Sequence, residues 1–257
     1  MPLTPALDSR CLPDASPREI LVHAATLGFT AVDLVVRPPA LETLVAETGP
    51  AASSPAAAVR AVTLETDPAE CLTSISPDAR RAARRQVVAA LDAARALRAT
   101  TLRLEARPAS PPPRPPECHD DVIHLALEAL LDLRFEAQAR AVRLACAVGR
   151  RGFLASPPEA RDFFDRINSP WVGAWLDLTE TADLAHPPDW IRTLGWRLAA
   201  LSLETPAAPG RPAQTTIDWP AVAAALRDAR YDGLVTLRGR DPAAAAAWLA
   251  DRLGPTP

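Results

Sequence analysis

Lysine is absent from this 257-residue sequence, and histidine, cysteine and long apolar runs are scarce. The four cysteines, Cys11, Cys71, Cys118 and Cys146, lack the Cys-x-x-Cys spacing of zinc clusters and disulfide scaffolds. Such scattered thiols indicate a reducing, cytoplasmic setting. No run approaches the roughly 20 apolar residues that cross a bilayer, and the first residues have neither the basic nor the apolar region of a signal peptide. We therefore expect no membrane association and no secretion.

An excess of charge of one sign is lacking too. The 28 arginines and 31 acidic residues are interspersed and leave a formal net charge of −3. Such a surface offers no basic face for nucleic acid, so we expect no nucleic-acid partner. Apolar residues make up 48% of the chain, which is enough for a sizeable core. The composition is compatible with an oligomer and leaves the oligomeric state open.

Short apolar runs alternate with helical stretches along the whole chain. Ser16-Pro17-Arg18-Glu19 has the pattern of a capping box with proline at the first helical position, and Ser156-Pro157-Pro158-Glu159 repeats it. Strands are expected at about residues 3–10, 31–36, 59–65, 100–105, 143–148, 172–180, 198–204 and 234–238. Helices are expected at about residues 17–28, 39–48, 77–97, 120–139, 157–168 and 189–194, and from residues 219 and 242 onward.

Eight strand–helix units in about 250 residues are what a (β/α)₈ barrel requires. A doubly wound sheet is the alternative, but no glycine-rich phosphate turn follows any of the expected strands. The strands are evenly spaced to the end of the chain, which leaves no room for a second domain. The sequence therefore predicts an α/β protein with a single (β/α)₈ TIM barrel over residues 1–257.

The sixth expected strand carries the clearest candidate for chemistry. Gly173, Trp175 and Asp177 alternate with apolar residues, so Asp177 points into the barrel at its C-terminal mouth, with Glu180 just beyond. This mouth is where barrel enzymes keep their active sites. Trp175 either stacks on a sugar or fills space left by small neighbours, and filling is the favoured interpretation.

Five stretches of the sequence match those of a known protein family. Four lie in the second half: Val142-Arg143-Leu144-Ala145, Ser169-Pro170-Trp171-Val172-Gly173 leading into Leu176-Asp177, Leu194-Gly195-Trp196-Arg197-Leu198, and Ile217-Asp218-Trp219-Pro220 through Ala229-Arg230-Tyr231-Asp232-Gly233. Leu27-Gly28-Phe29-Thr30-Ala31-Val32-Asp33-Leu34 matches more loosely. On these residues the chain resembles the sugar-phosphate isomerase/epimerase family, which implies a xylose isomerase-like barrel with its site at the mouth.

The resemblance also implies a set of metal ligands. In that family a divalent metal, often manganese, is held by a glutamate ending strand five, an aspartate ending strand six, a histidine in strand seven and a glutamate ending strand eight. Those positions fall here on Ala147, Asp177, Ser202 and Arg238, and a sugar-contacting histidine falls on Glu180. Alanine neither coordinates a metal nor takes a proton, and arginine stays cationic. One ligand of four remains.

The same substitutions indicate how the charge of the missing metal is replaced. We predict no metal cofactor, and an ion pair of Arg238 with Asp177, Glu180 or Glu204 in the place of the cation. The alternative is a divalent metal such as Mn²⁺ or Mg²⁺ in a rebuilt carboxylate site. An adjacent arginine would compete with such an ion.

The first functional hypothesis is a pseudoenzyme of this family that binds a small, sugar-like or anionic ligand or a partner protein. The alternative is an active isomerase, epimerase or lyase-type enzyme on a sugar-like or acidic substrate, with Glu180 or Glu204 as acid/base and Arg238 as an anchor. A structural role for the outside of the barrel is the third. The candidate ligand-binding residues are Asp177, Glu180, Ser202, Glu204, Arg238, Trp175 and Glu105.

Other motifs keep two interpretations. Glu65, Arg103 and Glu105 end expected strands and face either the mouth or the solvated rim. The proline-rich residues 108–116 match a P-x-x-P ligand, but a stiff loop over the mouth is the favoured interpretation. Residues 117–124 hold metal-binding side-chain types, although acids there also suit a helix N-terminus, which is favoured. Relatives that cut DNA at abasic sites use a histidine-rich zinc centre, for which four histidines in helices and loops are too few.

Overall fold

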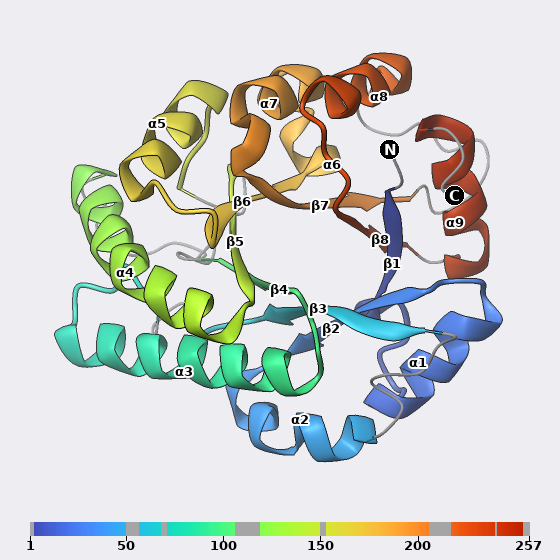
Figure 1. Cartoon of the computed structure of the whole chain (residues 1–257), viewed down its shortest axis with the longest axis horizontal. Coiled ribbons are helices and arrows are strands. Elements are labelled where there is room, and N and C mark those ends of the chain that lie inside the picture. The colour runs from blue at the N-terminus through green and yellow to red at the C-terminus, as the bar shows by residue number, and fades with distance from the viewer. Residues whose placement is uncertain are drawn as a thin grey trace.

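The computed structural model describes residues 3–49, 57–67, 71–105, 119–149, 153–205, 217–239 and 241–253. In this part of the chain eight parallel strands pair in chain order and close into a barrel between the last strand and the first. Helices surround the strands on the outside (Figure 1). The predicted (β/α)₈ barrel is confirmed, and its elements run from Thr4 to Leu253.

The strands are β1 (Thr4–Asp8), β2 (Ala31–Val36), β3 (Ala58–Leu64), β4 (Thr101–Leu104), β5 (Arg143–Ala147), β6 (Val172–Asp177), β7 (Leu198–Glu204) and β8 (Leu234–Arg238). The helices are α1 (Pro17–Thr26), α2 (Leu41–Thr48), α3 (Pro77–Ala96), α4 (His119–Arg140), α5 (Pro157–Ile167), α6 (Leu178–Thr181), α7 (Pro187–Leu194), α8 (Trp219–Asp228) and α9 (Pro242–Leu253). Short 3₁₀ turns are η1 (Ser9–Cys11), η2 (Pro38–Ala40) and η5 (Gly195–Arg197).

Helix starts follow the capping chemistry of the sequence. The Ser16 hydroxyl accepts from the Glu19 amide at 3.4 Å, and the Glu19 carboxylate accepts from the Ser16 amide at 2.8 Å, which completes the predicted capping box. The side chains of Ser76, Asp218 and Asp241 likewise accept from backbone amides at the starts of α3, α8 and α9. Local sequence therefore fixes where these helices begin.

Two local predictions need correction. The second capping box is not formed, because the Glu159 carboxylate accepts instead from the Ala155 amide at 2.9 Å and lies 2.6 Å from His119 Nε2. The strand expected at residues 172–180 ends at Asp177. Asp177 accepts from the next turn's amides and so starts the short helix α6.

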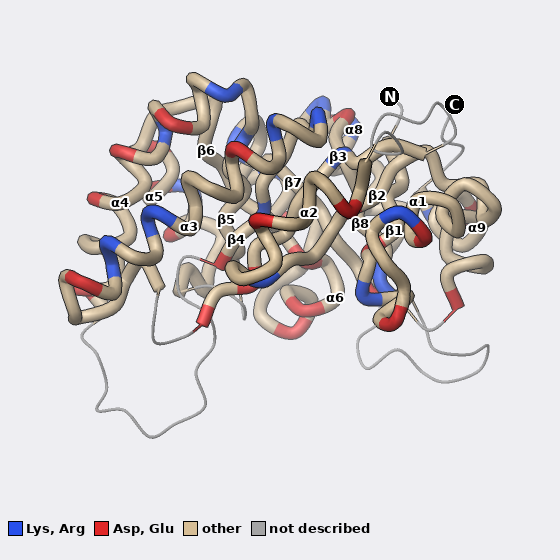
Figure 2. Tube along the Cα trace, turned by 90° about the horizontal axis from the view of Figure 1, so that it is seen from below, with Lys and Arg blue, Asp and Glu red and all other residues tan. Residues whose placement is uncertain are grey.

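The main apolar core lies between the barrel wall and the helices. Helix α3 shows the pattern, since Ala83, Val87, Leu91 and Ala94 are buried while its arginines face outward. Outside this shell, acidic and basic residues are interspersed along the visible helices (Figure 2). Among the described residues, no helix combines the length and apolarity that crossing a bilayer requires.

The inside of the barrel is lined by unusually small residues. Ala6, Ala31 and Ala61 cluster with Leu234 towards the N-terminal end. A second interior cluster joins Trp175 to the alanines Ala145, Ala147, Ala199 and Ala200. Barrels usually fill this space with branched aliphatic side chains. Here Trp175 is 2% exposed and occupies it, so the prediction that Trp175 fills the barrel is confirmed.

Candidate ligand site at the barrel mouth

Arg238, the last residue of β8, lies among three carboxylates at the C-terminal mouth. Its Nη2 atom is 3.5 Å from Asp177 Oδ2, 3.4 Å from Glu180 Oε1 and 3.6 Å from Glu204 Oε2. We call these four residues the Arg238 cluster. The predicted ion pair is confirmed, and the guanidinium contacts all three candidate acids rather than one.

Asp177 is held by the protein through both of its oxygens. Oδ1 accepts from the amides of Thr179 and Glu180 at 3.0 Å each. Oδ2 accepts from the Ser202 hydroxyl at 2.8 Å, and Ser202 in turn accepts from the indole N–H of Trp175 at 2.8 Å. A nearly buried carboxylate requires such partners. These contacts give Asp177 a role as a helix cap, independent of any metal.

A buried ion pair that was not predicted from the sequence occupies the centre of the barrel. The guanidinium of Arg103 on β4 contacts the Asp33 carboxylate on β2, and both side chains are fully buried. Hydroxyls of Thr63 and Thr236 also donate to Asp33, at 2.8 and 3.2 Å. The Arg103 guanidinium lies 3.8 Å from the Trp175 ring centroid, a cation–π contact. Arg103 thus faces neither the mouth nor the rim.

Asp8 and Arg10 form the third buried contact of this kind. Arg10 Nε lies 2.9 Å from Asp8 Oδ1 and Nη2 lies 2.6 Å from Oδ2, a bidentate arrangement. Burial raises the pKa of Asp8, but the bonds from Arg10 and the charge of Arg103 outweigh it and hold that pKa below its ordinary value. Each buried interior carboxylate therefore contacts a guanidinium: Asp8 with Arg10, Asp33 with Arg103, and Asp177 with Arg238.

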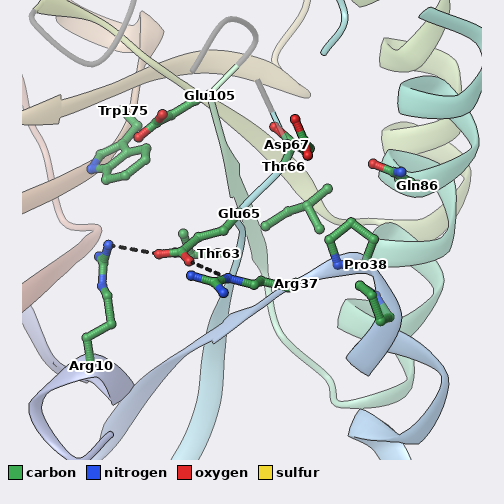
Figure 3. A pocket seen from close by; sticks show the side chains of 12 residues that line it. Arg10, Arg37, Pro38, Thr63, Glu65, Thr66, Asp67, Gln86, Glu105 and Trp175 are labelled. Carbon is green, nitrogen blue, oxygen red and sulfur yellow. Dashed lines mark hydrogen bonds and ion pairs between the residues drawn. The ribbon is translucent and has the colours of Figure 1, made fainter. Parts of the chain in front are cut away.

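A cavity of about 630 Å³ opens at the ends of β2, β3 and β4, and we call it the mouth cavity. Its walls include Arg10, Arg37, Glu65, Glu105 and Trp175. Figure 3 shows both arginines reaching the same Glu65 carboxylate, at 3.4 Å each, with Trp175 and Glu105 on another side of the cavity. The cavity therefore offers charges of both signs.

The structure divides the sequence candidates into two groups. Trp175 and Glu105 line the mouth cavity, as does Glu65. Asp177, Glu180, Ser202, Glu204 and Arg238 lie instead around the Arg238 cluster at the ends of β6, β7 and β8. Sequence reasoning missed Arg10 and Arg37, which lie just after β1 and β2. Their signal was a cationic side chain directly beyond a strand end.

The two other candidate stretches are settled only in part. Helix α4 begins at His119 with Asp120 and Asp121 in its first turn, which confirms the helix-start interpretation for the described residues of this stretch. Residues 108–116, predicted to cover the mouth, lie outside the described residues.

The barrel architecture has clear relatives. The sequence profile of the xylose isomerase-like TIM barrel family matches residues 21–254. The chain belongs to this family. No curated protein matches the chain in sequence at a significant level.

Solved structures share the same fold. A D-psicose 3-epimerase studied with D-fructose is 16% identical, with 98% of this chain and 100% of that chain covered and a TM-score of 0.81. A 3-keto-D-glucoside 4-epimerase from E. coli is 16% identical over 97% and 99% of the chains, with a TM-score of 0.81. A family 2 AP endonuclease from Brucella melitensis is 17% identical over 98% and 99%, with a TM-score of 0.74. At such identities the likeness shows the fold alone.

The residues at the metal positions implied by the resemblance do not fit a divalent cation. Ala147 is buried and has no donor atom, and the Ser202 hydroxyl is bonded to Asp177. Arg238 places a fixed positive charge 3.5 Å from the remaining ligand, Asp177. Among the residues that the structure describes, no group of three or more His, Cys, Asp or Glu side chains is arranged to hold a metal ion. A hard cation requires several oxygen or nitrogen donors in one shell.

Replacing Asp8 with asparagine is expected to make stability less dependent on acid pH. Because the folded-state pKa of Asp8 is lowered, its ionised form stabilises the fold above the ordinary aspartate pKa of about 3.9, and that contribution is lost as pH falls through the folded-state value. Urea unfolding at pH 7, 5, 4 and 3 should therefore show Asp8→Asn less stable than wild type at pH 7, with the difference shrinking below about pH 4.

The matched control is Asp78→Asn, whose side chain is 86% exposed on α3. It should follow wild type at every pH. A constant difference between Asp8→Asn and wild type from pH 7 to 3 would contradict the assignment, because it would mean that the ionised state of Asp8 contributes nothing.

Proposed function

We propose that this protein is a ligand-binding member of its family that has lost divalent-metal isomerase chemistry, that is, a pseudoenzyme. The observation that supports this most is the Arg238 cluster, in which the guanidinium lies within 3.6 Å of three carboxylates and both Arg238 and Asp177 stand at metal positions implied by the resemblance. A guanidinium neutralises acids but has no empty coordination position and does not act as a base. A site built in this way is suited to binding a ligand rather than to metal-assisted isomerisation.

The mouth cavity is our candidate for the ligand site. Its volume of about 630 Å³ lies within the range of small-molecule sites. Arg10 and Arg37 donate hydrogen bonds and Glu65 and Glu105 accept them, beside a wall that includes the nearly buried Trp175. A sugar-like or sugar-acid molecule has the hydroxyls and carboxylate that match these groups. Two structures of the same fold are sugar epimerases, which supports the same ligand class.

An enzyme with altered chemistry is the second candidate. Glu180 is 24% and Glu204 57% exposed, and both contact Arg238. A substrate carboxylate or phosphate that displaced them from the guanidinium would leave a carboxylate beside the substrate to move a proton. Turnover of a sugar acid or sugar phosphate, lost in Glu180→Gln, would favour this candidate over a binding role.

A reducing, cytoplasmic setting is part of the proposal. Cys11, Cys71 and Cys146 are free thiols. Burial raises the pKa of Cys146 to about 12, so this thiol stays protonated and inert. A chain with this thiol set needs no oxidising compartment to fold.

Elemental analysis of the purified protein tests the loss of the metal. We expect manganese, magnesium, zinc and cobalt all far below one equivalent, because Arg238 and Ala147 replace two of the donors. A stoichiometric metal that disappears in Asp177→Ala would refute the proposal. Wild type and Asp177→Ala are also analysed after incubation with excess Mn²⁺ and desalting, which distinguishes weakly adsorbed metal from metal held in a specific site.

Thermal-shift screening with sugars, sugar acids and sugar phosphates tests the binding role. A ligand at about 100 times its dissociation constant stabilises the fold by roughly 2.7 kcal/mol, or about 5–10 °C for a chain of this size. Arg37→Gln and Glu105→Gln should remove the shift, whereas Arg252→Gln on α9 should keep it. No shift from any of the three compound classes would contradict the proposal.

A further inference from the structure

A second cavity lies at the opposite, N-terminal end of the barrel, and we call it the floor cavity. Its volume is about 790 Å³. It exists because the interior layer above it is built from Ala6, Ala31 and Ala61, side chains too small to fill the barrel end. Its lining comes from the beginnings of the strands, and the polar members are Thr4, Thr30, Thr100, Thr101, Arg60, Arg98, Arg143 and Asp232.

Arg143 is the fixed cation of the floor cavity. It is the first residue of β5, and its Nη1 and Nη2 atoms donate to the carbonyls of Leu198 and Trp196 at 3.1 and 2.8 Å. A Cβ atom at Gly173 would lie 3.0 Å from Nη2 and would also meet the Arg197 carbonyl, so glycine makes room for this arrangement. The guanidinium is therefore held in place by backbone carbonyls.

The charge of Arg143 has no acidic partner among the described residues. Burial lowers its pKa, and of the described residues only Tyr231, whose phenol is itself buried and neutral, opposes this. A largely buried cation that is oriented but uncompensated is costly unless an anion reaches it. In the part of the chain that the structure describes, that anion does not come from the protein.

The other charged residues that line the floor cavity are also mainly positive. Arg60 and Arg98 are exposed at the cavity edge, and neither forms an ion pair with a described residue. Asp232 is the one acid among the described lining residues, whose three arginines and one aspartate together carry a charge of +2. Thr4, Thr30 and Thr101 add hydroxyls that can donate to an oxyanion, whereas the Thr100 hydroxyl donates to the Arg60 carbonyl at 3.3 Å. This concentration of positive charge contrasts with the whole chain, whose net charge is −3.

We propose that the floor cavity binds a phosphate group, either as inorganic phosphate or on a small phosphate ester. Guanidinium groups present paired N–H donors that match phosphate oxygens, and threonine hydroxyls complete the set of donors. The cavity is larger than a phosphate ion, so an ester with a small organic part fits in it. This site does not rest on the proposed function, because it lies at the other end of the barrel from the mouth.

The test is titration calorimetry of the full chain with inorganic phosphate and with glycerol 3-phosphate, at ionic strength held constant with sodium chloride. We expect saturable binding of at least one of the two. Arg60→Gln with Arg98→Gln should weaken it roughly tenfold or more, since two charge-assisted contacts are lost. Tighter binding of the ester than of the free ion would identify a phosphorylated metabolite as the ligand.

The control variant is Arg81→Gln with Arg85→Gln, which removes the same charge from the outer face of α3. It should bind like wild type, as should Arg238→Gln at the mouth. If the α3 variant bound phosphate as weakly as the Arg60/Arg98 variant, the loss would follow from the net charge of the protein and not from the floor cavity, and the proposal would be overturned. Loss of binding in Arg238→Gln alone would move the site to the mouth, and absence of saturable binding of either compound would likewise overturn it.

Discussion

Replacing Arg103 with leucine is expected to destabilise the protein by about 3–5 kcal/mol, because it leaves a buried carboxylate without its counter-ion. Asp33 would retain only the hydroxyls of Thr63 and Thr236. Asp8 would lose a charge that helps to keep it ionised. Trp175 would lose the guanidinium that lies 3.8 Å from its ring centroid and would keep mainly small alanine neighbours on that side of the barrel.

The measurement is urea unfolding followed by tryptophan fluorescence, with a fall in Tm of roughly 6–20 °C as the thermal counterpart. Arg81→Leu, which breaks an exposed pair with Asp78 on α3, is the matched control and should change stability by less than about 0.5 kcal/mol. A loss below about 1 kcal/mol in Arg103→Leu would mean that water reaches Asp33 and that the ion pair is not desolvated.

A double variant separates lost charge from lost packing. Asp33→Asn keeps an oxygen that can accept from the threonine hydroxyls but removes the negative charge. If charge dominates, Asp33→Asn with Arg103→Leu should be less destabilised than the sum of the two single variants, by about 1–3 kcal/mol. Additive effects would assign the loss to the space that Arg103 fills beside Trp175.

The strands of the barrel followed from local patterns. The predicted ranges 31–36, 198–204 and 234–238 coincide with β2, β7 and β8, because an apolar alternation has a definite start and end. The Arg238 cluster followed from the fold, since the ends of neighbouring parallel strands meet at one rim. Asp177 pairs with Ser202 and Glu204 with Arg238 in the strand register. Contacts between residues that the strand register brings together could therefore be predicted from the sequence.

The buried ion pair of Arg103 and Asp33 was not predictable in the same way. The two residues lie on β4 and β2, which are not hydrogen-bonded neighbours and meet only across the barrel interior. That meeting depends on the small size of the interior alanines, a property of the whole barrel. The same holds for the two cavities, because residues from several strands line each of them. A sequence pattern describes one strand at a time, so it does not predict features that depend on side chains from several strands together.

Restoring the family's donor set is expected to create a metal site where none is predicted now. The variant combines Ala147→Glu, Ser202→His and Arg238→Glu, while Asp177 stays in place. All four positions lie at the C-terminal ends of the adjacent strands β5, β6, β7 and β8. The change removes the competing cation and supplies three donors beside the remaining carboxylate. We expect one Mn²⁺ per chain by titration calorimetry, against no saturable binding in wild type.

Thermal shift gives a second readout of the same site. Mn²⁺ at about 100 times its dissociation constant should raise the Tm of the rebuilt chain by roughly 5–10 °C and leave wild type unchanged. Asp177→Ala in the rebuilt chain should abolish binding, whereas Ala147→Glu alone should not create it, because Arg238 would remain 3.5 Å from Asp177 and compete with the ion. If the rebuilt chain folds but binds no Mn²⁺, the strand ends lie too far apart to place the four side chains around one metal ion. Arg238 would then be a consequence of that movement rather than the replacement for a lost ion.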